Sequence, residues 1–243
     1  MKTLIPAMVA LTLAGTASAT PLYDYFGPLP EATFGGTGIP NDEVAVSSQF
    51  EDGDIIITVA LSATQRYSNP ALSNDGAGTY FAQAGSNYGG SGQSAYEGAL
   101  WNFNYYIDID GPGAQLTDYE ITLFYDFDPT EDNGPTTLGQ LNLSQTVADG
   151  IGGLDPNLTR LEDSQNLMFG FLAADALPYV DAPGGSFDPN ALGEYNFGIQ
   201  VSRAGWSVEQ VRMDVQVVPI PAGIVLFPSA LAVLALFRRL QRR

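Results

Sequence analysis

An acidic loop is the first place in the sequence where side-chain chemistry could gather. The stretch DFDPTEDNG, which starts at Asp126, offers several carboxylate and amide oxygens. Hard cations prefer such oxygens, and calcium takes six to eight of them. One interpretation is a calcium site with Asp126, Asp128 and Asp132 as ligands. The other interpretation is a set of solvated carboxylates beside a turn. The loop does not match the EF-hand pattern, because Glu131 stands where Gly is required and Thr137 where the closing Glu should be, and this mismatch favours the second interpretation.

A pair of carboxylates is the main catalytic device that the composition leaves available. The chain has no Cys and no His, and Lys2 is its only Lys. Triad and Schiff-base catalysis therefore lack an essential group, and zinc lacks its usual ligands. A glycosidase needs two carboxylates, one of them buried with a raised pKa. The carboxylates on the clearest alternating stretches all fall on the polar face: Asp108, Glu120, Asp126 and Asp214. We predict no enzymatic activity and keep a glycosidase as the less favoured alternative.

The N-terminus has the parts of an export signal. Lys2 precedes an apolar core that ends at Leu13, and small residues then lead to Ala17-Ser18-Ala19, the A-x-A pattern that a signal peptidase recognises. The core is too short to span a bilayer as a stable helix. A buried N-terminal helix fits less well because the segment has no polar face. We predict a signal peptide over residues 1–19, with cleavage between Ala19 and Thr20.

The C-terminus places an uncharged, mostly apolar stretch directly before a cluster of arginines. Four of the nine basic residues stand in the last six positions: Arg238, Arg239, Arg242 and Arg243. As a helix, the stretch from Ala222 to Phe237 would cover roughly 24 Å, which is short against a hydrocarbon core of roughly 30 Å. Arginines stay on the cytoplasmic side of a membrane. We predict one C-terminal transmembrane helix, oriented by the arginines and anchored in the inner membrane only transiently.

The order of these parts resembles the PEP-CTERM type of sorting tail. Val218-Pro219-Ile220-Pro221-Ala222 is similar to its VPLPA variant, with Ile220 in place of Leu. The resemblance covers residues 218–243 and implies processing near the proline motif by exosortase, a membrane cysteine protease-transpeptidase of Gram-negative bacteria. It also implies release or attachment at the cell surface, in a biofilm or exopolysaccharide setting. An ordinary tail anchor is the alternative, but it does not explain the proline motif.

Removal of both ends would leave a strongly acidic body. All twenty-seven carboxylates remain in it, against only four cations: Arg66, Arg160, Arg203 and Arg212. The net charge of about −23 repels nucleic acid and anionic lipid and favours solubility. We therefore exclude nucleic acid as a partner.

Strands must position any site in this body, because apolar and polar residues alternate along it. Alternation is clearest over residues 101–110, 119–127, 195–201 and 211–217. A period of two indicates strands with one face on a core. Further strand candidates are VAVSSQF, DIIITVALS, GTYFAQA, LGQLNLS and NLMFGFLA, and residues 157–163 are the one candidate for a short helical turn.

These patterns predict an all-β domain over residues 20–217, between the signal peptide and the sorting tail of residues 218–243. We expect eight or nine strands in an antiparallel β-sandwich or jelly roll. If residues 100–110 and 118–128 form a hairpin, the pair Asp108 and Asp110 lies at the opposite end from Asp126 and Asp128.

A segment rich in Gly, Ser and Asn, residues 73–94, interrupts the strands. The aromatic residues in or beside it could stack on sugar rings: Tyr80, Phe81, Tyr88 and Tyr96. The other interpretation, which we favour, places Tyr80 and Phe81 in a strand.

The sequence thus predicts an exported surface or extracellular-matrix protein with a structural or adhesive role. A carbohydrate-binding module is the alternative. The expected partners are signal peptidase, an exosortase-like protease and, as a further candidate, exopolysaccharide. We predict no cofactor, apart from calcium in the first interpretation of the acidic loop.

Overall fold

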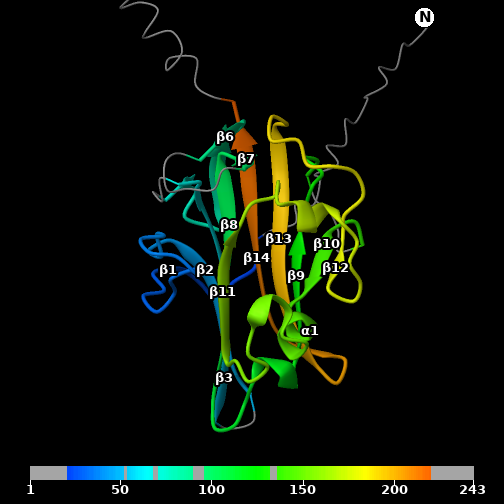
Figure 1. The fold of residues 1–243 in the computed structure, drawn as a ribbon. Helices are drawn as coiled ribbons and strands as arrows, with labels where there is room; N and C mark the ends of the chain where they lie inside the picture. Colours follow the sequence, from blue (N-terminus) through cyan, green and yellow to red (C-terminus); the bar gives the residue numbers. More distant parts are fainter. Residues whose placement is uncertain (1–20, 52–53, 68–70, 90–95, 132–135, 220–243) are drawn as a thin grey trace, which may run out of the picture.

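The computed structural model describes residues 21–51, 54–67, 71–89, 96–131 and 136–219 (Figure 1). Within these ranges the fold is all-β, and its strands are almost all antiparallel, as predicted. The predicted signal peptide and most of the sorting tail lie outside the described residues. Among the residues that are described, no helix is long and apolar enough to cross a membrane.

Two large sheets and one small hairpin make up the fold. The first sheet has five strands in the order β1 (Tyr25–Gly27), β2 (Val44–Glu51), β3 (Ile55–Gln65), β8 (Trp101–Asp110) and β11 (Arg160–Gln165). The second has seven, in the order β12 (Val180–Asp181), β10 (Gly139–Asn142), β9 (Glu120–Tyr125), β13 (Gly193–Arg203), β14 (Trp206–Val218), β5 (Thr79–Gln83) and β4 (Ser73–Asn74). The hairpin pairs β6 (Ser86–Tyr88) with β7 (Glu97–Ala99).

Helical segments are short in the described chain and lie in connections between strands. They are η1 (Leu116–Asp118), α1 (Leu143–Ala148), η2 (Ile151–Gly153) and η3 (Gly170–Ala173). At α1 the side chain of Asn142 accepts a hydrogen bond from the backbone N–H of Gln145, which caps the first turn.

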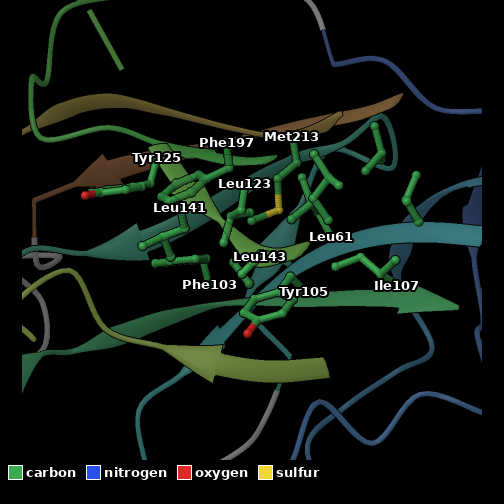
Figure 2. Close-up of a cluster of buried hydrophobic side chains, with 14 of the residues drawn as sticks. Leu61, Phe103, Tyr105, Ile107, Leu123, Tyr125, Leu141, Leu143, Phe197 and Met213 are labelled. Atoms are coloured by element: carbon green, nitrogen blue, oxygen red, sulfur yellow. The ribbon is translucent and has the colours of Figure 1, made fainter. Parts of the chain in front are cut away.

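The main core lies between the two large sheets. Figure 2 shows Leu61 of β3 and Ile107 of β8 from one sheet beside Leu123 of β9 and Met213 of β14 from the other. All four side chains are fully buried. Each burial of an aliphatic side chain of this size stabilises the fold by about 1.5–3 kcal/mol. The predicted alternation therefore identifies the residues that form this core.

A second, smaller core covers the outer face of the five-stranded sheet. The segment 28–41 places Leu29 and Phe34 against Tyr106 of β8. The Glu162 carboxylate of β11 holds this segment, because it accepts hydrogen bonds of 2.7 Å from the backbone N–H groups of Thr33 and Phe34. The predicted strand over residues 101–110 was expected to have one face on a core, but the structure also covers its second face at Tyr106, which is buried as deeply as the residues of the main core.

The structure also corrects the predicted pairing of strands. The strands β8 and β9 follow each other in sequence but lie in different sheets, so they form no hairpin. The pair β14–β5 is parallel, in contrast to the antiparallel arrangement expected throughout. The described residues form fourteen strands rather than eight or nine, and the five with only two or three residues show too little alternation to be seen in sequence.

Two local predictions fail for identifiable reasons. The stretch NLMFGFLA is not a strand but turns into η3, because the Asn166 side chain accepts from the backbone N–H groups of Ala99 and Met168 and so replaces a strand partner. The helical turn expected over 157–163 is also absent from the described chain, because its residues from Arg160 onward belong to β11, where Arg160 pairs with Asp108.

Candidate functional site

The predicted processing motif begins where the sheet ends. Val218 is the last residue of β14, and its carbonyl accepts a hydrogen bond of 3.2 Å from the backbone N–H of Ala84. Pro219 follows outside the strand. The remaining processing residues, Ile220, Pro221 and Ala222, lie outside the described residues. So do the signal-peptide junction, Ala19 and Thr20, and the four terminal arginines: Arg238, Arg239, Arg242 and Arg243.

The acidic loop lies at the same end of the molecule as Val218. Gly193, the first residue of β13, pairs with Val217 on one side. Next to it, Glu194 donates its backbone N–H to the Pro129 carbonyl at 3.1 Å. The fold therefore brings Val218, the first residue of the predicted processing motif, and Pro129 of the acidic loop to one end, where Figure 1 also places β6 and β7.

The predicted calcium ligands take different positions in the structure. Asp126 is buried, and one of its carboxylate oxygens accepts from the backbone N–H of Asp128 at 2.9 Å. Asp128 is exposed, and its carboxylate accepts from the backbone N–H of Thr130 at 3.0 Å. Asp132 lies outside the described residues. Within the described ranges no three acidic side chains are grouped so that they could hold a metal ion. Calcium binding therefore stays a prediction.

Buried polar groups cluster on the outer face of the seven-stranded sheet. The side-chain amide of Asn196 donates to Asp214 at 2.9 Å and to Glu194 at 3.2 Å. Asp126 and Asp214 are only 1% and 4% exposed, so the interpretation of Asp126 as a solvated carboxylate is wrong, and the polar face that carries Asp214 is covered at that residue. Burial, together with the nearby carboxylates of Asp126 and two further aspartates, raises the pKa of Tyr195 to about 12.

The aromatic residues in or beside segment 73–94 differ in their exposure. Tyr80 is buried in β5 and donates its hydroxyl to the Glu43 carbonyl at 2.7 Å, as the favoured interpretation requires. Phe81 lies on the same strand and is exposed. Tyr88 and Tyr96 are strongly exposed, and the Tyr88 hydroxyl donates to Glu97. Of the four aromatic candidates, only Tyr80 is therefore buried.

A pocket that sequence reasoning missed opens on the outer face of β9, β13 and β14. Its volume is about 220 Å³, and Gly198 lies at its centre between Phe124 of β9 and Arg212 of β14. The next row along the strands carries Gln200 opposite Gln210. The residues of this pocket lie at the polar positions of the alternating stretches and can be listed from the sequence. Only the register between the strands shows that these residues lie next to each other.

No match was found when the chain was compared with known protein families, with curated proteins and with solved structures.

Proposed function

We propose that this chain is an exported, non-enzymatic surface or extracellular-matrix protein of a Gram-negative bacterium. In this proposal, signal peptidase removes residues 1–19. The tail then holds the protein in the inner membrane until an exosortase-like protease processes it. The β-sandwich body has a structural or adhesive role in an exopolysaccharide setting.

The position of the proline motif relative to the fold supports this proposal most directly. β14 contributes Val211, Met213, Val215 and Val217 to the core and ends at Val218. Cleavage beyond Val218 would therefore leave every described strand intact. The prolines at 219 and 221 disfavour helix and lack the backbone N–H of a strand residue, so they favour an extended segment that a protease cleft can bind.

Mass spectrometry of the C-terminus in the native host tests this proposal. Wild type should have a shortened C-terminus near the proline motif. Replacement of the four terminal arginines by Ser should leave the tail uncut, because the stop-transfer charge is lost. Replacement of Pro219 and Pro221 by Ala should give a full-length, membrane-retained protein. The same shortened C-terminus in wild type and in both variants would refute the proposal.

A specific observation favours carbohydrate binding as the more detailed function of the body. The pocket over Gly198 combines amide, guanidinium and carboxylate side chains with the ring of Phe124. Ligand sites commonly place a few polar groups around an apolar surface in this way.

A further inference from the structure

The pocket on the outer face of the seven-stranded sheet is built from neighbouring strands in register. Gly198 of β13 pairs with Phe124 of β9 on one side and with Arg212 of β14 on the other. Residues directly opposite each other on neighbouring strands point to the same face of a sheet. The Phe124 and Arg212 side chains therefore stand on either side of a position that has no side chain.

Gly198 leaves the floor of the pocket open, although the backbone conformation at this position does not require a glycine. Its φ is not in the left-handed region, and a Cβ at this position would meet its nearest neighbours, the Val211 carbonyl and the Arg212 Cγ, at 3.5 and 3.6 Å. These are ordinary contacts, so a larger residue would fit the strand. A side chain here would, however, occupy the pocket.

The pocket walls offer both donors and acceptors of hydrogen bonds. Gln200 and Gln210 have amide groups that donate and accept, and Arg212 donates only. On the other side of Gly198 along the strands, the Asn196 side-chain amide donates to the Asp214 carboxylate at 2.9 Å. This hydrogen bond fixes the position of the carboxylate, which is an acceptor. Phe124 is half-buried and adds an apolar wall.

Arg212 differs from two other cations of the body in its surroundings. The Arg66 guanidinium is buried and donates to backbone carbonyls, and Arg160 forms an ion pair with Asp108. The exposed Arg212 side chain has no ion pair or side-chain hydrogen bond with the part of the chain that the structure describes. It therefore can donate to a ligand.

We propose that this pocket binds one neutral sugar unit of a polysaccharide. A sugar ring presents hydroxyl groups that both donate and accept, and it has an apolar face of C–H groups that can pack on Phe124. The strongly acidic body repels a polyanionic chain, so a neutral glycan is favoured over an acidic one. The volume is below the roughly 300–1,000 Å³ of sites for drug-sized ligands, which matches a single ring.

This inference rests on the exopolysaccharide setting of the proposed function and names the site and the ligand class. The test uses the full-length chain, purified in a detergent without a sugar headgroup. Calorimetric titration would compare neutral trisaccharides of glucose, mannose and galactose with a trisaccharide of uronic acids. We expect at least one neutral probe to bind, and to bind more tightly than the uronic acid probe.

Variants locate the binding in the pocket. Gly198→Val should weaken binding of the neutral probe by at least about tenfold because it fills the floor, with the melting temperature close to that of wild type. If Gly198→Val fails to fold, the smaller Gly198→Ala variant serves the same purpose. Gln200→Ala should weaken binding roughly fivefold or more through the lost hydrogen bond. Gln49→Ala, an exposed glutamine of β2 in the other sheet, should bind as wild type does.

Three results would overturn the inference: no binding of any neutral probe, binding that the pocket variants leave unchanged, or tighter binding of the uronic acid probe. The proposed function fails separately. If the tail is processed normally but no sugar binds, this inference alone is contradicted. If sugar binds in the pocket but the tail is never processed in the native host, the proposed function alone is contradicted.

Discussion

Arg66, one of the four arginines of the acidic body, has a structural role that can be described at the scale of a single residue. Its guanidinium is buried and donates to the carbonyls of Asn87 at 2.9 Å and Tyr96 at 3.1 Å, on either side of the β6–β7 hairpin. It packs against Gly98, where any Cβ would overlap the guanidinium. Arg66 therefore ties the β6–β7 hairpin to the end of β3, which is a structural role.

Replacement of Arg66 by Met should lower the free energy of unfolding by about 2–4 kcal/mol. The loss would come from the buried guanidinium and from the two partly buried carbonyls that would lose their charged donor, because hydrogen bonds to charged groups are among the stronger ones. The matched control is Arg160→Met, which breaks a partly exposed ion pair with Asp108 and should cost at most about 1 kcal/mol. Urea unfolding followed by tryptophan fluorescence would measure both, and equal losses would contradict the structural role of Arg66.

The start of β13 illustrates how an element is positioned by close backbone approach. Gly193 has a φ of +147°, and a Cβ there would collide with the Pro129 carbonyl. Directly after it, Glu194 donates its backbone N–H to that same carbonyl. The acidic loop can therefore lie against the first residues of β13, beside the last residues of β14, only because position 193 has no side chain.

Gly193→Ala should lower the free energy of unfolding by about 2–4 kcal/mol, because the added methyl forces the loop away and the backbone conformation is strained. The matched control is Gly170→Ala in η3, where no atom lies near the added Cβ and the φ is not positive. This control should change stability by no more than about 0.5 kcal/mol. A thermal melt of both variants would check the difference, and comparable melting temperatures would argue against the close approach.

Charge acts at the scale of the whole molecule. Carboxylates outnumber cations by twenty-seven to nine over the full chain. Self-repulsion of this kind destabilises the compact state, and salt screens it. A stabilising effect of calcium must therefore be separated from screening before it indicates a site.

If the acidic loop binds calcium, millimolar calcium should raise the melting temperature above that in NaCl of equal ionic strength, because binding to the native state alone stabilises it. Magnesium should do less, since it requires a tighter octahedral shell. Asp128→Asn should remove the rise in melting temperature that is specific to calcium. The control Asp110→Asn changes an exposed aspartate at the end of β8 and should keep this rise. The same melting temperature with calcium and with a chelator would exclude the site.

The sequence by itself determined which residues lie in the main core. Strand side chains alternate between two faces, so Phe103, Ile107, Leu123 and Val215 could be assigned to the buried side without knowledge of their neighbours. The predicted processing motif also comes from local order alone, and the structure adds only that β14 ends at its first residue, Val218. The tail itself remains a prediction, as do the signal peptide and calcium binding.

Only the tertiary structure decided which strands are neighbours, in which register they pair, and which segments cover their faces. The polar-looking face of β8 is covered because Glu162 holds Thr33 and Phe34, which are 129 and 128 residues away in sequence. The pocket over Gly198 exists because the register brings Phe124 and Arg212 to its two sides. Alternation is a local property with a period of two, whereas strand order, register and coverage depend on contacts between distant parts of the chain, which the local pattern does not encode.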